Sequence, residues 1–200
     1  MPFTPKPEYT MEILSQPYQA LPQALRRECA VMLHQAYQCP GEPDPDDALH
    51  KPEYHAQAFC LLQHGHPVAY AAVVGLTVSH GGQAFALAAL SCVATHPGHR
   101  RQGLGERVVA AASAWLRECG NYDIAAFTCD AELAPFYALA AGWRTVDDVV
   151  LLAHSGNHAL RSDRLGKTVM LELLSARAQS AAAAFRSTTI NLGLPEGEFI

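Results

Sequence analysis

The chain has few charged residues and no long apolar run. Asp, Glu, Lys and Arg make up 16% of its 200 residues, whereas half of the residues are apolar. This composition excludes a disordered protein, which combines low hydrophobicity with high charge. Gly, His or Ser interrupts each apolar stretch well short of the ~18 residues that a membrane span requires. The first nine residues hold three prolines and no signal-peptide pattern, so we expect a cytoplasmic protein without a membrane partner.

Basic residues and closely spaced cysteines are also scarce. The chain has 14 Lys and Arg residues and 19 Asp and Glu residues, which gives a net charge of −5. A nucleic-acid partner is therefore not expected, because it would need a basic footprint, whereas a cationic small molecule is a compatible partner. The cysteines form no CxxC pair, so we expect free thiols and no metal. They are Cys29, Cys39, Cys60, Cys92, Cys119 and Cys129.

The length indicates a single domain over residues 1–200, with a core at 9–173 and a tail at 175–200. Periodicity and turn signals predict strands at 9–14, 58–63, 68–78, 84–95, 123–128, 143–153 and 168–173, and helices that open at Pro22, Leu104 and Glu132. A loop with four prolines and three aspartates is expected at 39–52. The tail is expected to be weakly helical and then irregular. This order of elements predicts a mixed α/β sheet with helices on its faces.

The segment between a predicted strand and a predicted helix, Val93–Glu106, is rich in glycine and arginine. A helix that opens near Leu104 leaves its first N–H groups unpaired, and its dipole adds about half a positive charge there. Gly103 and Gly105 let the backbone approach a ligand closely. The segment therefore suits a diphosphate, although a plain turn explains the glycines equally well. It is neither a P-loop nor a GxGxxG turn, because the lysine of the one and the third glycine of the other are missing.

Arg100–Gly105 (RRQGLG) resembles the [RQ]-x-x-G-x-[GA] signature of GNAT N-acetyltransferases. Further along the chain, Ala134–Tyr137 (APFY) followed by Gly142 and Trp143 resembles a second element of that family. The two elements occur in the right order on the expected strands and helices, and the resemblance covers residues 9–173. It implies the GNAT acyl-CoA N-acyltransferase fold, which is a mixed, mostly antiparallel sheet flanked by helices.

The C-terminal residues of this chain resemble those of two branches of the family. Glu172 and Leu173, with the tail 194–200 (LPEGEFI), resemble the aminoglycoside 2′-N-acetyltransferases, and the nodulation-factor N-acyltransferases have a similar tail. This resemblance implies an acceptor that is a primary amine of a small cationic molecule such as an aminoglycoside.

The resemblance also implies acetyl-CoA as the co-substrate and direct transfer in a ternary complex. The pantetheine arm would pair with the strand at 92–95 like an added strand, and the N–H of Val93 would stabilise the oxyanion. The implied cofactor residues are Cys92, Val93, Thr95, Arg100, Arg101, Gln102, Gly103, Leu104 and Gly105.

Tyr137 falls where the family often has the acid that protonates the leaving thiolate. The alternative is that Phe136 and Tyr137 are core aromatics. One more residue than the family commonly shows separates Tyr137 from Gly142, so the direction of the hydroxyl stays open. Ser91 takes the place of a glutamate that often serves as base, and its hydroxyl can only orient a water.

Other candidate bases are His80, Asp130 and the tail carboxylates, each with an ordinary structural alternative, and nothing around Cys129 suggests an activated nucleophile. Acidic residues would attract a polycationic acceptor to the mouth of the site, although solubilising surface charges explain them as well. These residues are Asp44, Asp46, Asp47, Glu196, Glu198 and the terminal carboxylate of Ile200. Two alternatives remain: a non-catalytic acyl-CoA-binding module and transfer of a longer acyl chain. A homodimer is plausible from the family.

Overall fold

The computed structural model describes residues 11–200. The helices are α1 (Gln23–Ala36), α2 (Leu104–Glu118), α3 (Ala134–Ala141) and α4 (Ala176–Ser180). The strands are β1 (Met11–Pro17), β2 (Gln57–Gln63), β3 (His66–His80), β4 (Gln83–Thr95), β5 (Ile124–Asp130), β6 (Thr145–Val146), β7 (Val149–Leu152), β8 (Lys167–Leu173) and β9 (Thr188–Asn191). The first strand was predicted at 9–14, and its residues 9 and 10 lie outside the described residues.

Seven strands form one sheet in the order β1-β2-β3-β4-β5-β8-β6. Neighbouring strands are antiparallel except β4 and β5, which are parallel. These two strands pair only at Leu87 with Ile124 and at Ala88 with Ala125. Beyond these pairs the ladder between them ends, and the rest of β4 has no strand beside it on that edge. The prediction of a mixed, mostly antiparallel sheet flanked by helices is confirmed.

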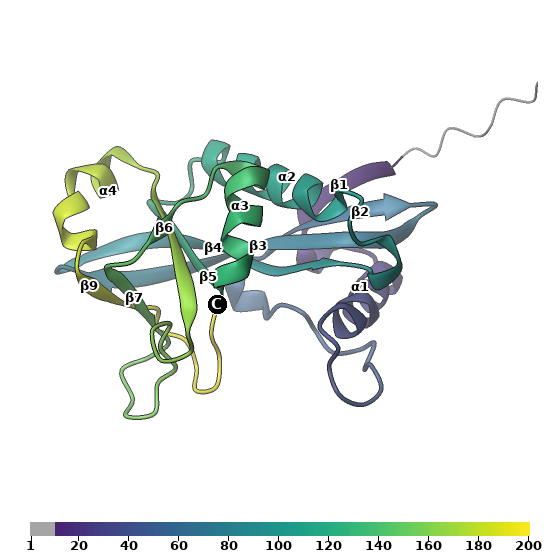
Figure 1. Ribbon diagram of the computed structural model, residues 1–200, viewed down its shortest axis with the longest axis horizontal. Helices are drawn as coiled ribbons and strands as arrows, with labels where there is room; N and C mark the ends of the chain where they lie inside the picture. Colours follow the sequence, from purple (N-terminus) through teal and green to yellow (C-terminus); the bar gives the residue numbers. More distant parts are fainter. Residues whose placement is uncertain (1–10) are drawn as a thin grey trace, which may run out of the picture.

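The sheet carries a helix on each face (Figure 1), with α2 above β2, β3 and β4 and α1 below β3 and β4. Each helix buries one side against the sheet. In α1 the buried side chains are Leu25, Cys29, Ala30, Met32, Leu33 and Ala36. In α2 they are Leu104, Val108, Val109, Ala112, Ser113 and Leu116. The helix on each face excludes water from the sheet, which is the layered arrangement that stabilises such folds.

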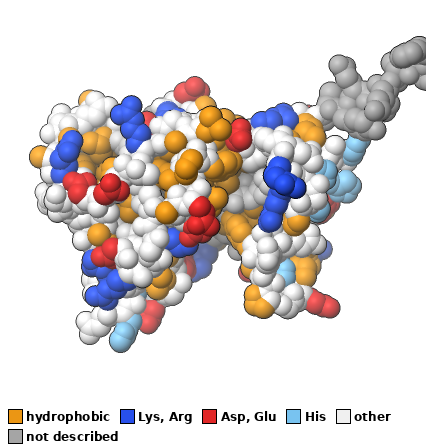
Figure 2. Space-filling view, in the orientation of Figure 1, with side chains coloured by type: hydrophobic (Ala, Val, Ile, Leu, Met, Phe, Trp, Pro, Cys, Tyr) orange, Lys and Arg blue, Asp and Glu red, His pale blue; other side chains and the backbone are white. Residues whose placement is uncertain are grey.

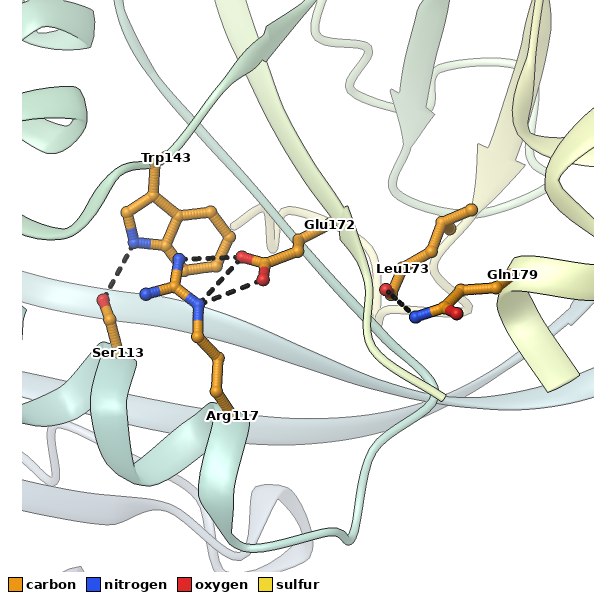
Figure 3. Close-up of polar contacts among 6 residues, drawn as sticks. All are labelled: Ser113, Arg117, Trp143, Glu172, Leu173 and Gln179. Atoms are coloured by element: carbon orange, nitrogen blue, oxygen red, sulfur yellow. Dashed lines mark hydrogen bonds and ion pairs between the residues drawn. The ribbon is translucent and has the colours of Figure 1, made fainter. Parts of the chain in front are cut away.

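A polar and aromatic cluster ties α2 to the β5–β8 half of the sheet (Figure 3). The indole Nε1–H of Trp143 donates to Ser113 Oγ at 2.9 Å. Arg117 donates from Nε and Nη2 to Glu172 Oε2 at 3.0 and 2.8 Å, and its guanidinium lies 5.2 Å from the centre of the Trp143 ring. Because Glu172 belongs to β8, these contacts fasten the C-terminal half of α2 to the second half of the sheet.

The C-terminal part of the chain departs from the sequence prediction in two places. The strand predicted over 143–153 is broken into β6 and β7, because Asp148 turns the chain: its carboxylate accepts the N–H of Ser187 at 2.9 Å, and its carbonyl accepts that of Thr188 at 2.9 Å. β7 leaves the main sheet and pairs in parallel with β9. The expectation that the tail becomes irregular after a weak helix was therefore wrong, because it contains the strand β9.

The tail is part of the packed body rather than an appendage. Phe185, Ile190, Leu192 and Leu194 are all buried, and Figure 1 shows the last residues returning beneath β5. Among residues 11–200, none of the helices combines the length and the apolar character that crossing a membrane requires.

Candidate functional site

The turn between β4 and α2 has the backbone geometry that the sequence predicts. α2 begins at Leu104 and is preceded by Gly103, whose φ of 72° is in the left-handed region that favours glycine. Within residues 11–200 no side chain caps the helix start, so its first N–H groups remain available to a ligand. Arg101 also has a positive φ, 61°. The turn therefore presents bare amides and a cationic residue together.

A cavity of about 430 Å³ lies in front of this turn. Its lining contains most of the predicted cofactor residues together with Tyr137, but neither Gln102 nor Cys92. The lining residues are Ala36, Tyr37, Val93, Ala94, Thr95, Arg100, Arg101, Gly103, Leu104, Gly105, Glu106, Leu133, Phe136 and Tyr137. The cavity therefore runs from the start of α2 along the free edge of β4. Figure 2 shows the surface hollowed between the two halves of the molecule, with apolar side chains gathered over α3.

The two arginines of the turn have different roles. Arg100 donates from Nη2 to the carbonyl of Ala36 at 2.6 Å, which ties the turn to the end of α1. Arg101 is exposed, and its guanidinium has no partner among residues 11–200. Arg101 is thus the cation that remains free for an anionic ligand.

Gly105 lies where three elements converge. A Cβ at this position would be 3.0 Å from Thr95 Oγ1 and 3.4 Å from Phe136 Cζ. The first distance is shorter than an unstrained contact, so a larger residue would push α2 away from β4 and α3. The glycine lets the helix start lie directly against the strand.

A β-bulge interrupts β4 beside this cavity. The register pairs Ala72 with Ser91 and Tyr70 with Ala94, so that Cys92 and Val93 lie opposite the single residue Ala71. Cys92 has a φ of 53°, which is a strained conformation for a residue with a side chain. The bulge therefore interrupts the regular ladder with β3 at Cys92 and Val93, where β5 has already diverged on the other edge.

Tyr37 is a site residue that the sequence analysis missed. It follows the last residue of α1, and its hydroxyl donates to the carbonyl of Val93 at 3.2 Å. About half of Tyr37 is exposed, 52%, and desolvation around its hydroxyl raises the pKa of that hydroxyl above its ordinary value. No local motif marks this residue, because its position follows from the packing of α1 against β4.

Tyr137 is buried against Phe127, with ring centres 5.0 Å apart, and it also lines the cavity. Its hydroxyl has no hydrogen-bond partner among residues 11–200. Burial, followed by the nearby Cys129 and Asp130, raises the pKa of Tyr137 to about 12. The hydroxyl is therefore protonated at neutral pH and can donate a proton into the cavity.

A second cavity, of about 310 Å³, lies on the other side of the bulge. It brings Ser91 together with two residues predicted for the acceptor site, Glu198 and Ile200. Its lining consists of Leu49, His50, Tyr54, Val74, Leu76, Ser91, Cys92, Leu194, Gly197, Glu198, Phe199 and Ile200. Because Cys92 lines this cavity and Val93 the first, the two cavities adjoin at consecutive residues of β4.

The acidic mouth expected from the sequence is not assembled. Asp46 forms an ion pair with Arg27 at 2.7 Å, and Asp46 and Asp47 line a separate space of about 100 Å³. Glu198 receives hydrogen bonds from Lys51 and Tyr54, which hold the pKa of its carboxyl below the ordinary value. Glu198 is therefore ionised but already paired.

Two of the predicted base candidates, His80 and Asp130, line neither cavity. His80 contacts the carbonyl of Ala184 at 2.7 Å and the ring of Phe185 at 5.1 Å, so it holds the tail. Asp130 pairs with Lys167 and makes no side-chain cap to the turn that follows it. Burial raises the pKa of the Cys129 thiol, which disfavours a nucleophilic thiolate.

His50 is a second residue that the sequence analysis missed. Only 3% of it is exposed, and its Nε2 lies 3.0 Å from Tyr70 Oη. Burial lowers the pKa of His50 to about 4, so the imidazole is neutral at pH 7. Within residues 11–200, no three His, Cys, Asp or Glu side chains are grouped to hold a metal ion.

Comparison with known proteins agrees with this geometry. The profile of the Acetyltransferase (GNAT) family matches residues 21–143, which is more than half of the chain. The GNAT family N-acetyltransferase YhbS from Escherichia coli, solved with CoA, superimposes with a TM-score of 0.64 at 14% identity, over 95% of this chain and 93% of that one. A GNAT family acetyltransferase from Brucella melitensis, solved with acetyl-CoA, superimposes with a TM-score of 0.50 at 17% identity, over 68% of this chain and 84% of that one.

A third structural neighbour is a longer protein from Enterococcus faecalis V583, whose function is unknown. It superimposes with a TM-score of 0.51 at 15% identity. The match covers 68% of this chain but only 32% of the longer neighbour. At such low identities the structural likeness shows a common fold. Among curated proteins, the comparison finds no significant match.

Proposed function

Because the chain belongs to the acetyltransferase (GNAT) family, we propose that it transfers an acetyl group from acetyl-CoA to a primary amine of a small cationic molecule. The transfer is direct, within a ternary complex. The observation that carries the proposal is the meeting of two cavities at Cys92 and Val93, one reaching the bare start of α2 and the other closed by the tail. Such a pair of cavities suits a cofactor and an acceptor that react where the cavities adjoin.

The first cavity holds acetyl-CoA in this proposal. The diphosphate binds the free amides at the start of α2 and the unpaired guanidinium of Arg101. The pantetheine arm lies along the edge of β4 that β5 leaves open, and its amides pair with that edge as an added strand would. One N–H of the pantetheine arm replaces the Tyr37 hydroxyl as the hydrogen-bond donor to the carbonyl of Val93.

The second cavity holds the amine. Its nitrogen, as the neutral base, attacks the thioester carbonyl, and the N–H of Val93 stabilises the oxyanion. A C–N bond forms, the C–S bond breaks, and the nitrogen releases one proton to solvent. The leaving thiolate takes a proton from Tyr137, which is protonated at neutral pH because burial raises its pKa to about 12. The Tyr137 phenolate then regains a proton from solvent, so the enzyme returns to its starting state. The products are the acetamide and CoA.

Acetyl-CoA binding and turnover test the proposal separately. Acetyl-CoA and CoA should raise the melting temperature, since a ligand that binds only the folded state stabilises it. Thiol release should follow when an amine is added. Arg101→Ala should weaken CoA binding by about tenfold through the loss of a charge-assisted contact. Arg144→Ala, which removes an exposed arginine outside the first cavity, should not.

The outcomes lead to different conclusions. No change of melting temperature with millimolar acetyl-CoA would overturn the proposal as a whole. Binding without turnover over a broad amine panel would favour the non-catalytic acyl-CoA-binding module. Faster transfer from longer thioesters would favour a long-chain acyltransferase. A homodimer, a cytoplasmic location and a single domain over 1–200 remain predictions.

A further inference from the structure

The second cavity has both apolar and polar walls. Apolar side chains from β3 and the tail, such as Leu76 and Leu194, form one part of the lining, and two carboxylates belong to the other. They are the side chain of Glu198 and the terminal carboxylate of Ile200. Lys51 balances the charge of Glu198, so the Ile200 carboxylate leaves the lining negative. This charge attracts a cationic amine and repels an acceptor that carries an acidic group.

Most neutral donors of this lining are already bonded within the protein. The Tyr54 hydroxyl donates to Glu198, and the Ser91 hydroxyl donates to Sγ of Cys92 at 3.5 Å. The thiol of Cys92 is a weak donor. The exception is His50, whose Nδ1 has no hydrogen-bond partner among residues 11–200. His50 is therefore the side chain of the lining with a strong donor or acceptor left for a ligand.

His50 is almost entirely buried, yet one of its nitrogens is open to the cavity. Only 3% of the residue is exposed. Among the residues of 11–200 that are not exposed, Nε of Arg26 is the one fully buried side-chain nitrogen or oxygen without a partner. The unpaired Nδ1 of His50 is therefore accessible from the cavity that His50 lines. The Tyr18 ring packs edge to face on the imidazole at 5.1 Å, which fixes the ring in place.

The bond to Tyr70 determines that Nδ1 is a donor. Tyr70 is fully buried, and His50 Nε2 is the hydrogen-bond partner of its hydroxyl, at 3.0 Å. If Nε2 donated, the phenolic hydrogen would be buried without an acceptor, which is costly. The hydroxyl therefore donates to Nε2, and the imidazole proton is on Nδ1. Burial lowers the pKa of His50 to about 4, so the ring is neutral at pH 7 and Nδ1–H is an uncharged donor.

We propose that the acceptor is a primary amine that also carries an uncharged oxygen, as an ether, hydroxyl or carbonyl group, and that His50 recognises this oxygen through Nδ1–H. The inference rests on the proposed function and narrows its substrate class. An amine without the oxygen leaves a buried N–H unpaired in the complex, which weakens the binding of its transition state. His50 is thus a specificity-determining residue, and Tyr70 is the positioning residue that holds it in its donor form.

Matched amines test this inference by thiol release with acetyl-CoA. Each pair exchanges one methylene for an ether oxygen: methoxyethylamine with butylamine, methoxypropylamine with pentylamine, and methoxybutylamine with hexylamine. The methoxy group is at the end of the chain opposite the nitrogen, so the pairs place the oxygen at different distances from the amine. We expect kcat/KM for the ether to exceed that for its alkyl partner about tenfold in at least one pair.

Two results of this panel lead to different conclusions. If the alkyl amine of every pair is as good a substrate as the ether, or better, the inference is overturned and the proposed function stands. Absence of turnover with every amine would overturn the proposed function, and this inference with it.

A double variant tests the role of His50 itself. His50→Phe with Tyr70→Phe removes both partners of the buried hydrogen bond and keeps two rings of similar shape, an exchange that is nearly neutral for stability. The ratio of kcat/KM for the preferred ether to that for its alkyl partner should fall to about one, because no donor remains. The thermal shift with acetyl-CoA should stay unchanged.

Two single variants complete the test. Tyr70→Phe leaves the imidazole proton free to occupy either nitrogen, so it should lower the same ratio by a smaller factor. His158→Phe, at an exposed histidine outside this lining, is the control and should leave the ratio unchanged. A ratio that stays at its wild-type value in the double variant or in Tyr70→Phe would overturn the inference.

Discussion

The hydrogen bond between Trp143 and Ser113 offers a sharp test of how α2 is held. Both side chains are buried, at 2% and 0% exposure, and the bond is 2.9 Å long. Ser113→Ala leaves the indole N–H without an acceptor in the core, which costs about 1–3 kcal/mol. For a domain of this length each kcal/mol lowers the melting temperature by about 2–4 °C. Urea unfolding followed by circular dichroism, together with calorimetry, measures both quantities.

A double-mutant cycle separates this bond from general packing. In a Trp143→Phe background the donor is gone, so Ser113→Ala should cost at least about 1 kcal/mol less than in the wild-type chain. Ser180→Ala is the matched control, because the Ser180 hydroxyl is exposed and bonds only within its own helix turn. An identical cost of Ser113→Ala in the two backgrounds would refute the reasoning.

Three more predictions concern the site and its support. Tyr137→Phe should lower kcat by roughly 10²-fold, at the low end of general-acid effects, with an unchanged thermal shift by acetyl-CoA; an unchanged kcat would remove the acid role. Lys51→Met leaves Glu198 with one partner less, so steady-state kinetics should show kcat/KM for spermidine rising relative to that for phenethylamine. The Asp123 carboxylate has its pKa lowered to about 2, mainly by Arg177; its stabilisation is therefore present above about pH 4 and lost as the pH falls toward 2. Asp123→Asn should flatten acid unfolding in that window, and an equally steep acid transition would contradict this.

The sequence predicts well whatever depends on neighbouring residues. The start of α2 and the glycine turn before it are local patterns, and the structure places them as expected. Contacts between distant residues were not predictable in this way. Lys51 and Glu198 are 147 positions apart, so their pairing, which cancels the expected acidic mouth, depends on where the tail returns. Likewise β9 is too short to recognise until β7 lies beside it.

The bulge in β4 and its divergence from β5 explain why Ser91 and Cys92 line one cavity while Val93 lines the other. In a regular paired strand, successive side chains alternate between the faces of the sheet, so Ser91 and Cys92 would not line the same space. Here the edge of β4 beyond Ala88 has no strand beside it, and the main chain itself forms the wall. The bulge at Cys92 and Val93 then turns the strand at the junction. A chain with an unbroken β4–β5 ladder would lack both the edge that suits a pantetheine arm and the junction where an amine can reach it.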